Sequence, residues 1–365
     1  MNSTTTTRKL NFSAGPAVLP ESVVRQAQED LWDLDGTGIG LLEHSHRGKA
    51  ISDVFDKADA LCRKVGNIPE DFEILYLQGG ASLQFSMIPM ALLTKDRQAD
   101  YINTGSWTKK AIEEAQRFGQ INVIWDGKEG SYRDLPDINE LKWNSDATYG
   151  YYCSNNTIYG TRWAQTPKAP TPLISDMSSE MYSRPIDWDA HDMIYAGAQK
   201  NLGPAGVTLV AIRRGLLEQA SKDLPAMLRY DIHASKGSRY NTPPVFAVYF
   251  LAQVFEWIQS NGGLKGIEEL NERKAAYIYD VIDGSGGFYT GHAAPRDRSR
   301  MNITFRCPSE ELESAFIEEA SNHDMANLKG HRSVGGLRAS IYNAFPEAGC
   351  RQFAEFMSEF ARTHG

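Results

Sequence analysis

Short apolar segments alternate with helical or loop segments through the middle of the chain, and this pattern restricts the fold more than any other feature. The predicted strands lie at 73–78, 100–103, 121–125, 149–153, 172–176, 193–195 and 207–212. Parallel strands need crossing connections, which are usually helices that cover both faces of the sheet. The pattern therefore predicts an α/β domain with a mostly parallel seven-stranded sheet covered by helices on both faces.

The character of the sequence changes after a predicted apolar helix at 246–259. Beyond it, the spacing of apolar residues predicts helices and strands at 266–283, 300–305, 309–322 and 337–342, followed by a last helix. A chain of 365 residues exceeds the usual size of one core. We expect a smaller α+β C-terminal domain and a large domain, with the divisions 1–15 (an N-terminal tail and active-site segment joining the small domain), 16–261 and 262–365.

Composition excludes several classes of protein. The 38 Lys and Arg against 46 Asp and Glu argue against a nucleic-acid or anionic-membrane binder. The four scattered cysteines show no CxxC spacing, so they favour reduced thiols in a cytoplasm over a zinc knuckle or disulfide scaffold. The polar N-terminus resembles a short disordered tail rather than a signal peptide, and the longest apolar stretch, 246–258, is too short to span a bilayer.

Lys200 stands among small residues in the stretch Ala196-Gly-Ala-Gln-Lys-Asn-Leu-Gly-Pro-Ala-Gly206, directly after a predicted buried strand. A solvated turn lysine is the ordinary interpretation of such a residue. Glycines, however, allow close approach of another group to the amine. A partly desolvated lysine at a strand end is suited to Schiff-base chemistry.

Two further features follow predicted strands. Asp176 ends the strand at 172–176, and in a pyridoxal-phosphate enzyme such a carboxylate pairs with the pyridinium nitrogen. The turn Gly79-Gly80-Ala81-Ser82 lies between a strand and a helix, where free N–H groups and a hydroxyl suit a phosphate. Ligands of parallel α/β sheets bind at the carboxyl ends of the strands, which is where all three features are expected.

The chain resembles the phosphoserine aminotransferases, a family of fold-type I, class V pyridoxal-phosphate enzymes. The resemblance runs from Asn11-Phe-Ser-Ala-Gly-Pro16 to the C-terminal helix. Eight motifs carry it in order: LLEHSHRGK at 41–49, LQGGASLQF at 77–85, NTGSWTKKA at 103–111, SNNTIYGTR at 154–162, SDMSSEMYSRPID at 175–187, GAQKNLGPAG at 197–206, YNTPP at 240–244 and GHRSVGGLRASIYNA at 330–344.

The resemblance implies pyridoxal 5'-phosphate as cofactor and a catalytic pair, Lys200 as Schiff-base lysine and acid/base with Asp176 at the ring nitrogen. Trp107 would stack on the ring and Thr157 would bond near the ring or phosphate, although a core aromatic and a strand-end threonine are ordinary alternatives. The remaining implied cofactor contacts are Gly80, Ala81, Ser82 and Gln199, with Asn241 and Thr242 reaching the phosphate from a neighbouring subunit.

The resemblance also implies how substrates bind. Arg338 would be the fork for the α-carboxylate. The pairs His46-Arg47 and His331-Arg332 would take the substrate phosphate or the glutamate side-chain carboxylate, with one pair crossing a homodimer interface, and Ser13 completes the implied substrate-binding set. No carboxylate or thiolate cluster accompanies His44 and His46, so no metal site is expected there.

The implied activity is a reversible transamination of 3-phosphohydroxypyruvate with L-glutamate, in a cytoplasmic homodimer of serine biosynthesis. The related 4-phosphohydroxythreonine of pyridoxine biosynthesis is a possible second substrate. Two alternatives lie within class V: a small-substrate transaminase such as an alanine- or serine-glyoxylate enzyme, and a cysteine desulfurase, for which Cys307 and Cys350 have no suitable loop setting. A catalytically inactive binding or scaffold protein is the alternative from another class, and it predicts a substituted Lys200 or Asp176.

Overall fold

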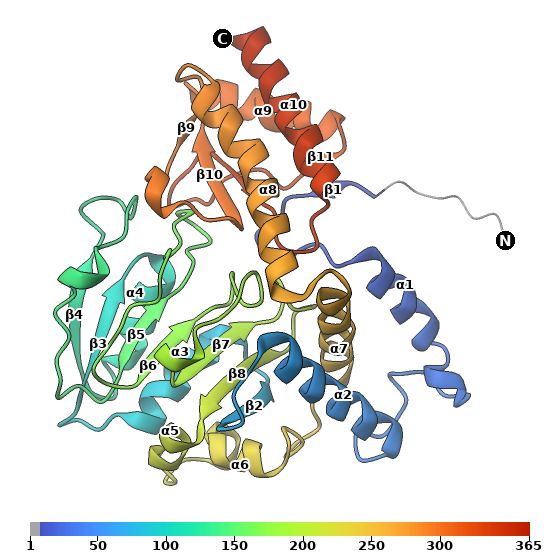
Figure 1. The fold of residues 1–365 in the computed structure, drawn as a ribbon, viewed down its shortest axis with the longest axis vertical. Helices are drawn as coiled ribbons and strands as arrows, with labels where there is room; N and C mark the ends of the chain where they lie inside the picture. Colours follow the sequence, from blue (N-terminus) through green and yellow to red (C-terminus); the bar gives the residue numbers. More distant parts are fainter. Residues whose placement is uncertain (1–7) are drawn as a thin grey trace.

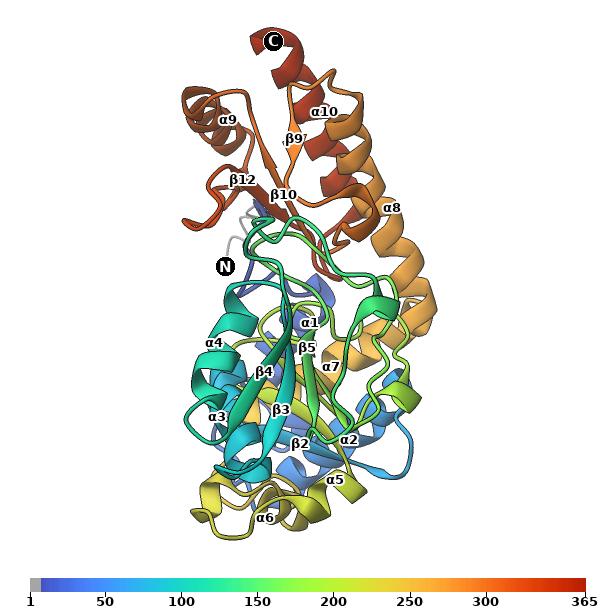
Figure 2. The ribbon, with the colours of Figure 1, turned by 90° about the vertical axis from the view of Figure 1, so that its left-hand side faces the viewer.

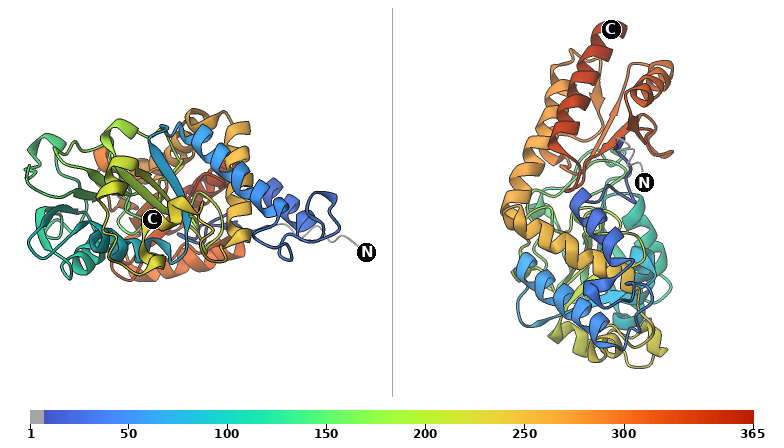
Figure 3. Two further views of the ribbon diagram at one scale, coloured as in Figure 1. Left: turned by 90° about the horizontal axis from the view of Figure 1, so that it is seen from below. Right: turned by 90° about the vertical axis from the view of Figure 1, so that its right-hand side faces the viewer.

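The computed structural model describes residues 8–365, and Figure 1 shows two parts joined by a long helix. The larger part is a broad sheet with surrounding helices, and the smaller part contains the C-terminal helix. Helix α8 (Gly263–Gly284) runs from the larger part into the smaller one, where it packs beside α10 (Glu347–His364) (Figure 3). The expected disordered tail falls mostly on residues 1–7, which lie outside the described residues.

The central sheet has seven strands in the order β2-β8-β7-β6-β5-β3-β4. Strand β8 runs antiparallel to both of its neighbours, and all other neighbouring pairs are parallel. The strands are β2 (Phe72–Leu77), β3 (Gln98–Asn103), β4 (Gln120–Asp126), β5 (Gly150–Cys153), β6 (Leu173–Asp176), β7 (Met193–Gly197) and β8 (Thr208–Arg213). The predicted seven-stranded, mostly parallel sheet is confirmed.

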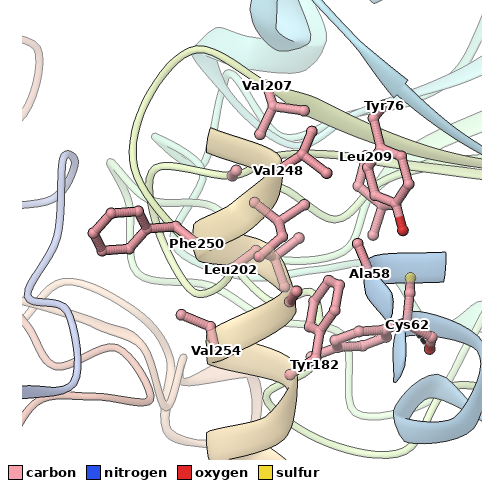
Figure 4. Close-up of a cluster of buried hydrophobic side chains, with 14 of the residues drawn as sticks. Ala58, Cys62, Tyr76, Tyr182, Leu202, Val207, Leu209, Val248, Phe250 and Val254 are labelled. Carbon is pink, nitrogen blue, oxygen red and sulfur yellow. Dashed lines mark hydrogen bonds between the residues drawn. The ribbon is translucent and has the colours of Figure 1, made fainter. Parts of the chain in front are cut away.

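Helices cover both faces of this sheet. Apolar side chains point from most of its strands to both faces, so both faces have to be buried. Figure 2 shows α3 and α4 beside the sheet, and two buried clusters result, one beneath α2 and α7 and one beneath α3 and α4. Figure 4 shows part of the first, in which Val248 of α7 lies on the side of the helix that faces Leu209 of β8 and Ala58 of α2. The helices are α1 (Glu21–Asp30), α2 (Lys49–Gly66), α3 (Gly80–Leu92), α4 (Ser106–Ala115), α5 (Arg214–Gln219), α6 (Tyr230–Ser235) and α7 (Val245–Ser260).

The smaller part has its own core. Its antiparallel sheet has the order β12-β10-β9, and a parallel pair of two-residue strands, β1 and β11, lies beside it. A third buried cluster joins α8, α9 and α10 to this sheet and includes Phe12 from the N-terminal segment. The elements are β1 (Leu10–Asn11), β9 (Thr290–Gly291), β10 (Asn302–Arg306), α9 (Glu310–Asn322), β11 (Met325–Ala326) and β12 (Leu337–Ser340).

Several elements differ from expectation, among them the short strands β1, β9 and β11 and the short helices α5 and α6, which were not predicted. Helix α2 was not predicted, although its buried positions Ile51, Phe55, Ala58 and Cys62 recur at helical spacing. Helix α3 begins at Gly80, three residues before the predicted start at Leu83, because left-handed Gly79 precedes it with a φ of 90°. The Gly-rich turn is therefore the first turn of a helix.

The structure also bears on membranes and metals. Over residues 8–365, no helix is long and apolar enough to cross a bilayer. Within the same range, no three His, Cys, Asp or Glu side chains are grouped to hold a metal ion.

Candidate active site

Three parts of the central sheet meet at one edge. Strands β2, β6 and β7 run in the same direction, since β8 reverses between β2 and β7. Their carboxyl ends therefore bring together Gly80 after β2, Asp176 at the end of β6 and Lys200 shortly after β7. This is the edge at which parallel α/β sheets bind ligands.

A cavity of about 320 Å³ opens at this edge, and most of the expected site residues line it. Those it contains are Gly80, Ala81, Ser82, Trp107, Thr157, Asp176, Gln199, Lys200, His331 and Arg338. The other lining residues are Ala14, Gly15, Phe85, Cys153, Asn155, Ile158, Ser178 and Ser179. The cavity thus unites residues from the N-terminal segment, the sheet and the smaller part.

The amine of Lys200 lies between side chains from two other parts of the cavity, Thr157 and Trp107. Its Nζ donates a hydrogen bond to Thr157 Oγ1 at 2.9 Å and lies 6.0 Å from the centre of the Trp107 ring. Burial lowers the pKa of Lys200, the charge of Asp176 opposes this shift, and Arg338 adds to it. The surroundings therefore make the neutral, nucleophilic amine more accessible than in water.

Asp176 is buried on the neighbouring strand, with 4% of its surface exposed. Its Oδ1 accepts a hydrogen bond from the backbone N–H of Ser178 at 2.9 Å. It lies opposite Cys153 on one side and Tyr195 on the other, and its charge contributes to the raised pKa of both, behind the larger effect of burial. A buried carboxylate with one such bond retains capacity to accept from a cationic ring nitrogen.

The first turn of helix α3 also lines the cavity, through Gly80, Ala81 and Ser82. This helix has 13 residues and no side-chain cap, and the N–H groups of a first helical turn have no partners within their own helix. A Cβ added at Gly80 would meet nothing within 4 Å, so the space in front of this turn is open. Positive helix-end dipoles and unpaired N–H groups bind phosphate well.

The indole ring of Trp107 forms a flat aromatic side of the cavity. It lies in the first turn of α4, and its Nε1 is a buried donor without a partner among the described residues. The cavity suits a phosphorylated aromatic aldehyde with a basic ring nitrogen. The amine can react with the aldehyde, the buried carboxylate can pair with the ring nitrogen, the aromatic face can stack on the ring, and the open helix N-terminus can bind the phosphate. The residues present thus fit pyridoxal 5'-phosphate.

Arg338 and His331 enter the cavity from the smaller part. Arg338 lies on β12, and its Nη1 donates to the carbonyl of Thr157 at 3.2 Å. Burial lowers the pKa of Arg338. Burial also lowers the pKa of His331, and the positive charges of Arg338, Arg332 and Lys110 lower it further. This end of the cavity is cationic and suits anionic substrates.

The structure does not bring the other expected residues into this cavity. His46 and Thr242 line a separate pocket of about 410 Å³. Arg47 is exposed beside His46, and Asn241 donates to Gln78 Oε1 at 3.0 Å outside the cavity. Two more lie next to lining residues without lining the cavity themselves: Ser13 precedes Ala14, and the exposed Arg332 follows His331.

Cys153 and Gly15 are cavity residues that the sequence did not single out. Cys153 ends β5, so the rule that identified Asp176 would have found it. Its thiol is buried, donates to the Asn155 carbonyl at 3.3 Å, and has a raised pKa because of burial, unlike an exposed desulfurase nucleophile. Gly15 has a φ of 138°, and a Cβ there would lie 3.5 Å from Lys200 Cγ. The sequence feature that could have identified Gly15 is the Gly-Pro pair before helix α1.

Known proteins resemble the chain over nearly its full length. The family model described as aminotransferase class-V matches residues 9–353. A phosphoserine aminotransferase from Lysinibacillus sphaericus is 49% identical over 360 residues, which cover 98% of this chain and 99% of that protein.

Two solved structures are similar as well. The phosphoserine aminotransferase of Bacillus circulans subsp. alkalophilus has 45% identity and a TM-score of 0.96, covering 98% of this chain and 99% of that one. The pyridoxal-phosphate-bound enzyme of Trichomonas vaginalis has 38% identity and a TM-score of 0.91, covering 96% and 99%. The expected fold, that of the fold-type I pyridoxal-phosphate transferases, is confirmed.

Proposed function

This chain belongs to the class-V aminotransferase family, and on that premise we propose that it exchanges an amino group between L-glutamate and 3-phosphohydroxypyruvate. The products are 2-oxoglutarate and O-phospho-L-serine. One observation carries the proposal: the Lys200 amine shares a cavity with buried Asp176 and the open N-terminus of α3. The 4-phosphohydroxythreonine of pyridoxine biosynthesis is a second proposed substrate of the same cavity.

The cofactor is pyridoxal 5'-phosphate, and the residues that would hold it are those of the cavity. The first turn of α3 would bind the phosphate, Asp176 the ring nitrogen, Trp107 the ring face and Lys200 the aldehyde carbon. When bound, this group supplies a cationic ring that delocalises the negative charge left when a substrate Cα loses its proton.

Lys200 moves the proton at the substrate Cα. A lysine amine acts as a base only when neutral, and burial favours the neutral form here. The hydroxyl of Thr157, 2.9 Å from Nζ, orients the amine. The same nitrogen would then give this proton to the cofactor carbon that had been bound to Lys200, and it would reverse the transfer in the second half of the reaction, so one group serves as base and acid.

Arg338 and His331 select the substrate in this proposal. The guanidinium of Arg338 would bind the α-carboxylate with two parallel hydrogen bonds. Its bond to the Thr157 carbonyl supports this role by fixing the guanidinium close to the residue that contacts Lys200. His331, with Arg332 beside it, would bind the distal phosphate or carboxylate.

We propose a homodimer in which each chain lends its His46-Arg47 loop and its Asn241-Thr242 segment to the other chain's cavity. Two observations support it. These residues lie outside the cavity of their own chain, although they belong to the motifs expected at the site. Apolar side chains are exposed in the segment between α1 and α2, which also carries His46 and Arg47, and they include Trp32 at 86% and Leu42 at 64%. A second copy is the natural cover for such a surface.

A mixing experiment tests the homodimer. Lys200→Ala and Arg47→Ala should each be inactive alone, but a hybrid dimer carries one cavity with both wild-type residues. After subunit exchange, activity should return to about one quarter of wild type, since half the dimers are hybrids with one active site each. No recovery despite demonstrated exchange would contradict the shared site, and a monomer in light scattering would contradict the dimer.

Two smaller proposals remain. We propose a cytoplasmic location, supported by four free, buried cysteines, which suit a reducing compartment. We also propose that 16–261 and 262–365 are separate domains, with 1–15 joining the second at the site. Separate buried clusters around the two sheets support this division.

Half-reactions test the activity itself. The purified protein should be yellow and should lose that absorbance with L-glutamate, and 3-phosphohydroxypyruvate should then restore it. Pyruvate and glyoxylate are the matched acceptors that lack a phosphate. Restoration only by these two would favour a small-substrate transaminase, release of alanine and sulfur from cysteine would favour a desulfurase, and a colourless protein that cannot be reconstituted would favour a scaffold.

A further inference from the structure

Lys274 is a fully buried lysine that the reaction described above does not use. It lies on the inner face of α8, and none of its surface is exposed. Its ammonium donates to four backbone carbonyls, those of Ile341 at 3.1 Å, Tyr342 at 2.8 Å, Asn343 at 3.2 Å and Phe345 at 3.3 Å. All four carbonyls belong to one segment, 341–345. The ammonium therefore holds the backbone of that segment in one conformation, much as a metal ion bound by the same four oxygens would.

No carboxylate pairs with this ammonium in the part of the chain that the structure describes. Burial lowers the pKa of Lys274 to about 8, while Cys350 and Glu347 on α10 oppose that shift. Burial raises the pKa of Cys350 to about 12, so the thiol is neutral, and Glu347 accepts bonds from Arg273 and Tyr277 instead. The carbonyl dipoles are therefore the main partners of the charge, and a buried charge is retained only where such partners are well placed.

The 341–345 segment connects to both sides of the cavity. It follows β12, the strand that carries Arg338. The hydroxyl of Tyr342 donates to the carbonyl of the cavity residue Ala14 at 2.8 Å. The backbone N–H of Asn343 donates at 3.1 Å to the side chain of Asn201, the residue after Lys200. Any shift of this segment would therefore reach both Arg338 and the loop of Lys200.

Asn271 provides a second attachment one turn earlier on the same helix. Its Nδ2 donates to Asn343 Oδ1 at 2.9 Å and to the carbonyl of Ser183 at 3.1 Å. Asn343 in turn donates to the carbonyl of Tyr182 at 2.8 Å. Asn271 thus ties the segment to the larger part, and Lys274 fixes its backbone.

We propose that Lys274 is a positioning residue for substrate binding: its ammonium fixes the 341–345 segment and, through it, the placement of Arg338 relative to Lys200. The inference rests on the transamination proposed above. Arg338 and Lys200 come from different parts of the chain, so a fixed connection between them is needed for one substrate to meet both. Lys274 touches neither substrate nor cofactor.

Lys274→Met tests this, because methionine fills similar space without charge or donors. The expected result is an increase of about tenfold or more in KM for L-glutamate, a smaller change in kcat, and unchanged cofactor absorbance. The matched control is Lys265→Met on the same helix, where the lysine is exposed and bonds to nothing near the site. A lysine with only a structural role would lower the amount of folded enzyme or its melting temperature but leave KM unchanged.

Two further measurements sharpen the test. Lys274→Ala should regain the wild-type KM with n-propylammonium, which has the shape of the missing side chain, but not with n-propanol. In a double-mutant cycle, Arg338→Ala should raise KM less in the Lys274→Met background than in wild type. An unchanged KM in Lys274→Met, or strictly additive effects in the cycle, would overturn the proposal.

Two controls keep the outcome interpretable. If Lys274→Met does not fold, Tyr342→Phe breaks the bond to Ala14 without leaving a charge unpaired, and an unchanged KM there also overturns the proposal. A wild-type protein that does not use L-glutamate would refute the proposed function instead, so the two failures are distinguishable.

Discussion

Replacement of Asp176 by asparagine isolates the charge at the base of the cavity. Asparagine keeps the shape of the side chain and an oxygen for the bond from Ser178 N–H, which is 2.9 Å long. Only the negative charge is lost. Because Asp176 is 4% exposed, water could not replace that charge at the ring nitrogen in the proposed arrangement.

The size of the effect follows from this burial. A hydrogen bond to a charged group contributes about 1.5 to 3 kcal/mol, and two unit charges 4 Å apart at a partly screened site attract by about 4 kcal/mol. We expect a loss of about 2 to 4 kcal/mol in the step that removes the Cα proton. This corresponds to a rate about 30-fold to 1,000-fold lower, at 1.36 kcal/mol per factor of ten.

Stopped-flow absorbance with L-glutamate measures that step directly, and titration of the cofactor checks that the site remains filled. Asp126→Asn is the matched control, since Asp126 ends β4 at the same edge of the sheet but is exposed and outside the cavity. A rate for Asp176→Asn within about threefold of wild type, with the cofactor bound, would refute the assigned role of this carboxylate.

Other changes give separate tests. Lys200→Arg keeps a cation but removes a usable base, so stopped-flow measurement of the half-reaction should show a loss of about 100-fold or more. Arg338→Lys replaces the guanidinium fork by a point charge and should raise KM for L-glutamate about tenfold in steady-state assays, with a smaller change in kcat. The pKa of His331 is lowered below its usual value of 6.5, so the imidazole loses its positive charge as pH rises. Calorimetry should therefore show that 3-phosphohydroxypyruvate binds more weakly as pH rises and that protons are taken up when it binds to the neutral imidazole. His331→Gln should abolish that proton uptake. Phe353→Ala empties a fully buried site in the core of the smaller part and should cost about 3 to 5 kcal/mol in urea unfolding of that part.

The sheet was predictable from the sequence because most of its strands are short, buried apolar segments that end at, or are followed by, polar or glycine residues. Helix α2 was missed despite the regular spacing of Ile51, Phe55 and Ala58. Gly48 precedes it without a capping side chain, so the usual signal for a helix start is absent. The paired strands β1 and β11 have two residues each, which is too short for any periodicity.

The site was predictable where it depends on strand ends. Lys200 and Asp176 follow strands that run in one direction, so the topology places them together. Cys153 satisfies the same rule and was missed because a lone cysteine after a strand carries no motif of its own. His46 and Arg47 belong to a site motif, but His46 lines another pocket and Arg47 is exposed beside it. A sequence motif does not show whether its residues face the cavity of their own chain.

The two ends of the cavity have different origins, and this affects how substitutions should act. The larger part supplies Lys200 and the first turn of α3, whereas Arg338 comes from the small sheet. The span between amine and guanidinium therefore depends on how the two parts are joined. Helix α8 runs between them, and its inner face holds the 341–345 segment through Lys274 and Asn271. Substitutions on that face should alter KM without touching substrate, whereas substitutions on its exposed face should not.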